Sequence, residues 1–445
     1  MSQSIAAPAS RRFRSQSPAR ARARSIGLVP LTLAFSLAGL TATQGAAALT
    51  LAEAERLAVE RDAVLRQLGS ESLAMRERAV AEGQLMDPKL RLGAVNVPVD
   101  SFSLDEEDMT MLEVGVSQEF PAAGTRELAR RRMEQSAVAA EAVAADRRLL
   151  VQREVRRAWT ELAYLARARE LLASQSDWVE QMRAAARARY ASGEGKQLEL
   201  LQAGLDVAML REQQLDLERD EAMRRAQLGR WIGEEEAARA GPFSLPARAD
   251  LEPLATLEGR LPGHPAQLDF ERRIEAANTG VDLAKQGRKP GWMLDLSYGL
   301  RSGRMLDGES RPDMLSAMVS VDLPLFRSNR QAREVAAARA EARGLHEMHD
   351  DHQREMRAML AEAWNVADRT AELERFFETE LVPLAEQSVQ AALLAYRSNR
   401  VMVDEVIGAR RVALETWLKH LRLVADRAQA RYDVDYLVGG TNHED

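Results

Sequence analysis

The spacing of apolar residues predicts long helices that pack against one another. In the first half of the chain these residues recur in steps of three, four or seven, which is heptad spacing: Val151, Val155, Ala158, Leu162, Leu165 and Leu172. Two stretches of 66 residues, 125–190 and 331–396, are predicted as the longest helices. Pro383 is expected to kink the second one. Each long helix is followed by a short turn and a returning helix, 196–233 or 402–439.

Four short segments instead alternate between apolar and polar residues, which predicts β-strands. They lie near 88–97, 110–120, 291–300 and 314–323. The apolar positions of the third segment are Trp292, Leu294, Leu296, Tyr298 and Leu300. Those of the fourth are Leu315, Ala317, Val319, Val321 and Leu323. The polar positions include three carboxylates, Glu113, Asp295 and Asp322.

The two strand pairs belong to two halves of the chain that repeat one another. Pro121, which ends "VSQEFP", aligns with Pro324, which ends "VSVDLP", at an offset of 203 residues. Tyr190 and Tyr396 align at an offset of 206. Each repeat is expected to begin with a helix, and in the first repeat this helix covers residues 49–86. The predicted organisation is an N-terminal segment 1–48, a first repeat 49–233, a connector 234–265 with several Pro and Gly residues, a second repeat 266–440 and a tail 441–445.

Alternating strands of this kind have two explanations. The sheet has one face on a core and the other in water, or it belongs to a membrane β-barrel, in which lipid-facing and lumen-facing residues alternate. The second explanation is favoured, because the two hairpins lie far apart in the sequence and nothing else β-like is available to pack on them. Four strands cannot close a barrel, so several copies would have to contribute strands to a symmetric ring.

The N-terminal segment has the features of a secretory signal peptide. Six arginines precede the apolar run "IGLVPLTLAFSLAGL", and a small-residue cleavage site follows it and ends at Ala48. The alternative is a retained membrane anchor, although the run is short for a membrane span. Removal of this segment would change the net charge from −7 to −13. The rest of the sequence contains no cluster of basic residues that would indicate nucleic-acid binding.

Composition narrows the function further. Hydrophobic residues make up 46% of the chain and charged residues 29%, which suits a protein with a large core. The absence of cysteine excludes disulfides, thiolate metal sites and a lipid on an N-terminal cysteine, so an unmodified N-terminus is expected. The sequence has no P-loop, no G-x-S-x-G and no H-E-x-x-H motif, so neither an enzyme nor a bound cofactor is expected.

The ordered repeat resembles the TolC family of outer-membrane efflux proteins over essentially all of 49–440. The segments that carry the resemblance are "VSQEFPAAGTR", "VSVDLPLFRSNRQ", the turn "YASG", "LVPLAEQSVQAALLAY" and the glycines at 233 and 439. The resemblance implies a homotrimer in the outer membrane of a Gram-negative bacterium, extending into the periplasm. The fold class implied is mainly α with a small β part. Each copy would contribute a coiled-coil wall to an α-barrel and four strands to a transmembrane β-barrel of about twelve strands.

Two segments, "DPKLRLGAVNVPVD" and "SYGLRSGRMLDGESRPDMLSAMVSVDLPLFRSNRQ", are most similar to the heavy-metal efflux subgroup of the Cus and Czc type. This resemblance implies a passive exit duct for heavy-metal cations. Its partners would be a periplasmic adaptor protein and an inner-membrane pump of the resistance-nodulation-division (RND) class. A drug-efflux or type I secretion duct is the alternative within the same fold. A periplasmic adaptor or coiled-coil scaffold is the alternative from another class, but an adaptor should also contain a lipoyl-like β-domain.

Acidic residues near the starts of the two returning helices are the candidates for a periplasmic gate. Members of the family narrow the tunnel there with carboxylates, and this chain has Glu199, Asp404 and Glu405. A ring of carboxylates would attract cations and repel anions. The simpler explanation is that they complement the positive ends of helix N-termini. The turns before these helices are the expected adaptor-docking tips, with Ser192, Gly193, Ser398 and Asn399.

The resemblance also assigns the strand residues. Glu113, Asp295 and Asp322 are expected in the lumen of the barrel. The expected lipid-facing residues are Trp292, Leu294, Leu296, Tyr298, Val319 and Val321. Pro121 and Pro324 are expected where the strands leave the sheet for the long helices, because proline donates no ladder hydrogen bond.

The segment "HEMHDDH" is a candidate metal site. His346, His349 and His352 step by three residues and would share one side of a helix. Imidazoles at such spacing could hold Zn, Co, Ni or Cu ions. A polar stripe on an exposed helix is the commoner explanation of the same pattern.

Overall fold

The computed structural model describes residues 49–398 and 400–440. The predicted signal peptide, Asn399 and the tail 441–445 therefore lie outside the described residues. The helices are α1 (Leu51–Arg61), α2 (Ala63–Glu82), α3 (Thr125–Ala191), α4 (Gln197–Ile232), α5 (Glu234–Arg239), α6 (Leu254–Glu258), α7 (Pro265–Gln286), α8 (Gln331–Phe376), α9 (Val382–Arg397) and α10 (Val403–Leu437). The strands are β1 (Lys89–Val95), β2 (Met111–Phe120), β3 (Trp292–Leu300) and β4 (Met314–Val321). The prediction of a mainly helical chain with tandem repeats and a small β part is confirmed.

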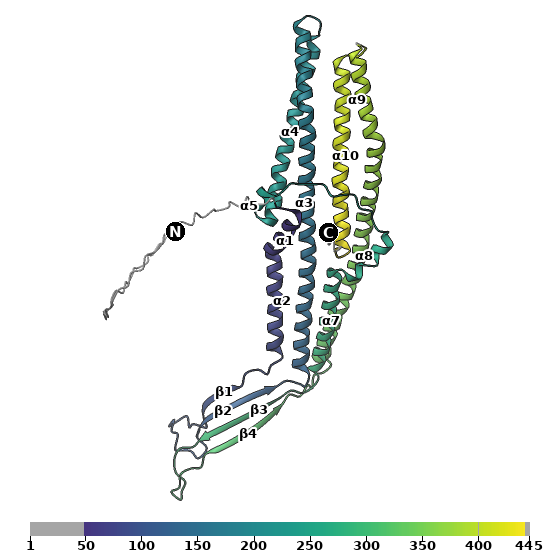
Figure 1. Cartoon of the computed structure of the whole chain (residues 1–445). Coiled ribbons are helices and arrows are strands. Elements are labelled where there is room, and N and C mark those ends of the chain that lie inside the picture. The colour runs from purple at the N-terminus through teal and green to yellow at the C-terminus, as the bar shows by residue number, and fades with distance from the viewer. Residues whose placement is uncertain (1–48, 399, 441–445) are drawn as a thin grey trace, which may run out of the picture. The chain divides into compact units, whose positions relative to one another are not determined.

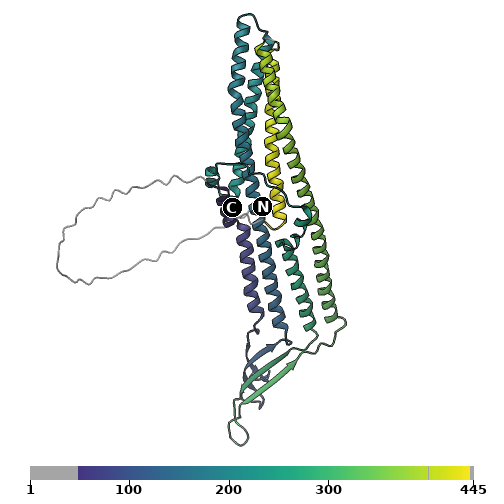
Figure 2. The same ribbon diagram turned by 45° about the vertical axis from the view of Figure 1, so that its right-hand side comes forward.

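Two long helical hairpins dominate the described part of the chain. One consists of α3 and α4, and the other of α8, α9 and α10 (Figure 1). The returning helices α4 and α10 cover only the part of the body away from the sheet. The part next to the sheet is completed by α2, which packs on α3, and by α7, which packs on α3 and α8 (Figure 2). Each repeat therefore uses a short helix to complete the wall beside its long one.

Proline interrupts the second long helix, as its sequence position predicts. Residues Phe377–Leu381 form a π-helical turn between α8 and α9, and Pro383 stands in the first turn of α9. Proline has no N–H for the preceding turn, and its ring crowds the carbonyl four residues earlier. The first repeat has no proline at the matching place, and α3 continues unbroken for 67 residues, roughly 100 Å.

The helix expected at 49–86 is in fact two helices, α1 and α2, which meet at Asp62. The Asp62 carboxylate accepts a hydrogen bond from the Leu65 N–H at 2.7 Å and caps α2. It also pairs with Arg147 of α3 at 2.8 Å. Burial acts to raise the pKa of Asp62, but the hydrogen bonds from Arg147 and Leu65 outweigh it and hold the pKa below its usual value. The break is thus fixed by a charged contact with another helix.

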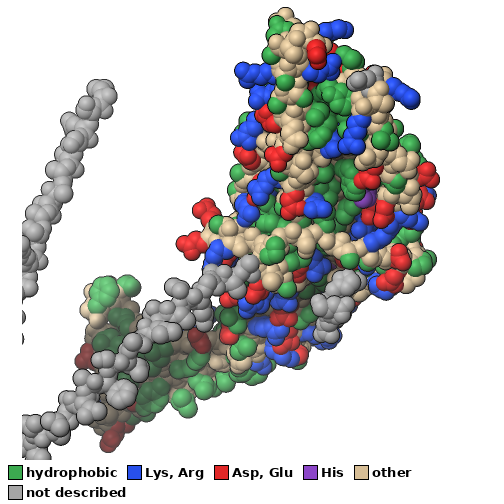
Figure 3. All heavy atoms as spheres, turned by 45° about the horizontal axis from the view of Figure 1, so that its top comes forward, with side chains coloured by type: hydrophobic (Ala, Val, Ile, Leu, Met, Phe, Trp, Pro, Cys, Tyr) green, Lys and Arg blue, Asp and Glu red, His purple; other side chains and the backbone are tan. Residues whose placement is uncertain are grey.

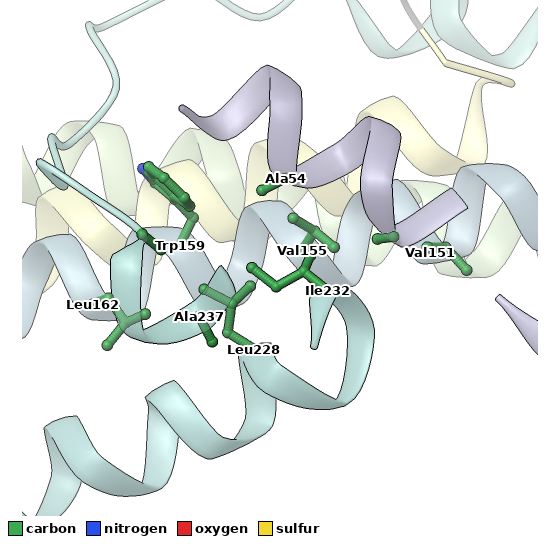
Figure 4. Close-up of a cluster of buried hydrophobic side chains, with 10 residues drawn as sticks. Ala54, Val151, Val155, Trp159, Leu162, Leu228, Ile232 and Ala237 are labelled. Carbon is green, nitrogen blue, oxygen red and sulfur yellow. The ribbon is translucent and has the colours of Figure 1, made fainter. Parts of the chain in front are cut away.

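The middle of the helical body contains two apolar clusters, one in each repeat. In the first, Val151, Val155 and Leu162 of α3 pack against α1, α4 and α5 (Figure 4). Five of the six heptad residues are buried, and Ala158 is partly buried against the cluster. The Trp159 ring packs edge-on against the Phe243 ring, with the ring centroids 4.7 Å apart. The heptad pattern therefore identified the packing face of α3 correctly.

The second cluster gathers α6, α8 and α10 around Leu360. Trp364, which aligns with Trp159 in the repeat, donates its indole N–H to the Glu252 carbonyl at 2.9 Å. Both tryptophans thus hold a part of the connector 234–265 against the helical body. None of the helices in the described ranges is long and apolar enough to cross a membrane.

His264 joins three helices at the start of α7 and is only 1% exposed. Its Nδ1 accepts a hydrogen bond from the Ala266 N–H at 3.1 Å, and its Nε2 donates to the Tyr436 carbonyl oxygen at 3.0 Å. The Tyr436 hydroxyl donates to Asp146 of α3 at 2.9 Å. Burial lowers the pKa of His264, although Asp146 and the Tyr436 carbonyl act in the opposite direction.

This lowered pKa predicts that stability falls as the pH falls through about 6.5, the ordinary value for histidine. In that window the unfolded chain binds a proton that the folded chain does not, so acid favours unfolding. His264→Asn keeps a capping side chain but removes the titration. We expect the thermal midpoint to drop less between pH 7.5 and 5.5 in the variant than in the wild type. Equal drops in both proteins would contradict this role.

Candidate functional site

The four strands form one antiparallel sheet in the order β1-β2-β3-β4, so the hairpins of the two repeats join between β2 and β3. Val116 of β2 faces Leu296 of β3, which faces Ala317 of β4. The outer edges of β1 and β4 pair with no strand in the described part of the chain. The sheet therefore has two open edges, which in a finished assembly need partners.

One face of this sheet is apolar and uncovered. Val114, Val116, Leu296, Tyr298, Val319 and Val321 are each between 43% and 61% exposed. Leu294 is partly buried, and Trp292 is exposed. Figure 3 shows charged side chains scattered over the helical part, whereas hydrophobic side chains predominate on the visible part of the sheet at the lower left. An apolar face of this extent is unfavourable in water and marks a surface that something else covers.

The opposite face is polar and is organised by Arg91 of β1. Its guanidinium lies 2.8 Å from the carboxylate of Glu113 on β2 and 2.8 Å from that of Asp295 on β3. Gly115 stands between them without a side chain, and Arg91 crosses over it. Asp322 lies just after β4 and is exposed. Two of the three predicted lumen carboxylates are therefore brought together, by an arginine that the sequence patterns did not single out.

Aromatic side chains mark both ends of the apolar face. At the end next to the helices, Phe120 stacks on Trp292 with ring centroids 4.1 Å apart. At the loop end, the Tyr298 hydroxyl donates to Asp313 at 2.7 Å. Pro121 follows β2 directly, and Pro324 follows β4 after two intervening residues. Aromatic residues at the borders of an apolar band are typical of membrane strands, whose polar rims they contact.

A buried arginine ties together the two loops at the far end of the sheet. Arg311 is 9% exposed and donates to the carbonyl oxygens of Asp105, Glu107 and Ser302. It also pairs with the Asp108 carboxylate at 2.8 Å. The loop of the first repeat is thus held against the loop of the second.

The candidate gate residues lie in the first turns of α4 and α10. Glu199 is partly buried, whereas Asp404 and Glu405 are exposed. Neither Lys196 nor Met402, the residues that precede these helices, caps its helix with a side chain. The carboxylates therefore complement uncapped helix N-termini, and the exposure of Asp404 and Glu405 leaves these two accessible to ions.

The turn between α3 and α4 is a tight one. Ser192 follows the last residue of α3 as its C-cap, and Gly193 adopts a positive φ of 81°, a conformation that favours glycine. In the second repeat the Ser398 hydroxyl donates to the Leu394 carbonyl oxygen at 3.1 Å.

The three histidines of "HEMHDDH" are not gathered into a metal site. His346 donates to the Ala342 carbonyl of its own helix at 2.9 Å, and His349 lies 2.9 Å from the Gln267 side-chain oxygen of α7. His352 packs against the ring of Phe270. Throughout residues 49–398 and 400–440, no group of three or more His, Cys, Asp or Glu residues is placed to hold a metal ion. His349 and His352 instead contact α7, and His346 bonds to its own helix.

Solved outer-membrane channels share this fold. The outer membrane protein VceC of Vibrio cholerae aligns with a TM-score of 0.74 at 18% identity, over 88% of this chain and 96% of that one. CusC aligns with a TM-score of 0.71 at 14% identity, over 88% of this chain and 92% of CusC. The Neisseria gonorrhoeae MtrE channel aligns with a TM-score of 0.71 at 16% identity, over 88% of this chain and 89% of MtrE. A search of curated proteins found no match.

These likenesses show that the chain has the fold of solved outer-membrane channels. The model of the outer membrane efflux protein family matches residues 55–234 of the sequence. The match covers most of the first repeat, which is less than half of the chain.

Proposed function

We propose that three copies of this chain form an exit duct in the outer membrane of a Gram-negative bacterium. The observation that carries the proposal is the sheet, which combines an uncovered apolar face with two open edges. If β4 of one copy pairs with β1 of the next, three copies close about twelve strands into a barrel without edges. The apolar face, including Leu296 and Val319, then contacts lipid, and the face with Arg91 and Asp295 lines the lumen.

The helices of the three copies would extend the duct through the periplasm. A periplasmic adaptor would dock at the tips around Gly193 and Ser398, and an RND pump in the inner membrane would supply the energy. Heavy-metal cations are the proposed cargo, in line with the sequence resemblance to the heavy-metal efflux subgroup. The duct itself is passive and catalyses no reaction.

Cell fractionation tests the location and the assembly together. We expect the protein in the outer-membrane fraction, where it should migrate as a trimer in unheated detergent samples and as a monomer after boiling. A soluble monomer would contradict the proposal.

The carboxylates at the start of α10 are proposed to form the cation-selective part of the gate. Threefold symmetry would place Asp404 and Glu405 three times around the pore, where their field attracts cations. Replacing both by alanine should therefore reduce the preference for K⁺ over Cl⁻ in planar bilayers. The measurement is the reversal potential under a salt gradient. Glu362→Ala is the control, because it removes an exposed carboxylate within α8, and it should leave the reversal potential unchanged. An unchanged reversal potential in the Asp404/Glu405 variant would contradict the assignment.

A further inference from the structure

All four methionines of the strands lie on the polar face of the sheet. Met318 is paired directly with Asp295, and Met314 is paired with Gly299. Met293 precedes Asp295 by two residues on β3, and Met111 precedes Glu113 by two residues on β2. Successive residues of a strand point to opposite faces, so these positions share the face that carries Arg91. The other face of the strands contains no methionine.

The thioethers form two groups along this face. Near the loop end, Gly299 has no side chain, and the Met111 sulfur occupies the space that a Cβ would take. Met314 lies opposite the same glycine. Nearer the helices, Met318 is paired with Asp295, and Met293 stands two residues before Asp295 on β3. Gly299 and Asp295 are four residues apart on β3, which places the two groups roughly 13 Å from one another.

We propose that this methionine face is a binding site for soft monovalent metal ions of the Ag(I) and Cu(I) class. Thioether sulfur is a soft and neutral ligand that suits such ions and needs no deprotonation. Asp295, whose carboxylate also pairs with Arg91 at 2.8 Å, stands at the second of these groups. The inference rests on the proposed function, because the face lines a pore only when the copies assemble into a duct.

Weak ligation is what a conducting site requires, because an ion must enter each site and leave it again. Two groups of thioethers spaced along the lumen give such an ion successive resting places. Apolar packing alone does not account for the arrangement, since leucine and valine, which fill the same role, are concentrated on the opposite face.

The test uses variants that remove the sulfur but keep the volume. Leucine is close to methionine in size, so Met→Leu at positions 111, 293, 314 and 318 should preserve the fold. Ag(I) binding is measured on the detergent-solubilised trimer in chloride-free silver nitrate, by calorimetry and by metal analysis after dialysis. Met348→Leu, which alters an exposed methionine of α8, is the matched control. Met318→Leu combined with Val319→Met moves one thioether to the opposite face of the same strand.

We expect the wild type and Met348→Leu to bind Ag(I) equally, and the four-leucine variant to bind it with roughly tenfold lower affinity or worse. The variant with the relocated thioether should bind no better than Met318→Leu alone. Wild-type affinity in the four-leucine variant, or no binding by the wild type, would overturn the inference. The four-leucine variant should still form the heat-sensitive trimer, which shows that the fold and the assembly are intact. A wild type that forms no conducting trimer would instead overturn the proposed function.

Discussion

Replacing Leu296 by arginine is expected to abolish accumulation of the trimer in the outer membrane. Leu296 lies in the middle of β3 on the uncovered apolar face and is 46% exposed. In the proposed barrel its side chain points into lipid near the middle of the bilayer. An arginine on the lipid face at that depth costs about 2–4 kcal/mol in each copy, and the threefold assembly incurs this cost three times.

Ser297→Arg is the matched control for this prediction. Ser297 is the next residue on the same strand and points to the polar face. It should therefore tolerate arginine, and the trimer should be recovered in the outer-membrane fraction at near wild-type amounts. If Leu296→Arg assembles as well as Ser297→Arg, the apolar face does not contact lipid.

Replacing Arg427 by methionine is expected to destabilise the helical body strongly. Arg427 of α10 and Glu374 of α8 form an ion pair in which both residues are buried. Without the arginine, the Glu374 carboxylate stays buried with no compensating charge. Breaking a buried pair in this way costs about 3–5 kcal/mol. The midpoint of the thermal loss of helical circular dichroism measures the effect.

The double variant Glu374→Leu/Arg427→Met separates the charge from the packing. Apolar residues of similar volume often replace a buried ion pair without loss. The double variant should therefore melt much closer to the wild type than Arg427→Met does. A double variant that is as unstable as the single one would show that the contact acts through packing and not through charge.

Patterns with a short period predicted most of the fold. The heptad positions identified Val155 and Leu162 as core residues, because a helix face repeats regularly along the chain. Alternation identified the two faces around Leu296, because each strand residue points opposite to its neighbour. Pro383 predicted the interruption between α8 and α9, because its effect on a helix is local.

Features that depend on distant residues could not be predicted in the same way. The break at Asp62 depends on Arg147, which lies 85 residues further on. The polar cluster of the sheet needs Arg91 to meet Asp295, 204 residues away. The spacing of the histidines predicted that they share one side of α8, but it did not predict their partners, such as Gln267 of α7 beside His349. Long-range contacts of this kind leave no periodic trace in a sequence.

Cross-linking between copies tests the central claim, that open sheet edges of neighbouring copies meet in a closed trimer. The chain has no cysteine, so the introduced cysteines are the only thiols that a cross-linker can modify. Lys89→Cys on β1 and Ser320→Cys on β4 place one exposed thiol at each open edge. A bis-maleimide added to outer membranes should convert this double variant into covalent dimers and trimers and nothing larger. Each single-cysteine variant should stay monomeric on denaturing gels. A double variant that stays monomeric, or that forms chains longer than three, would contradict the account.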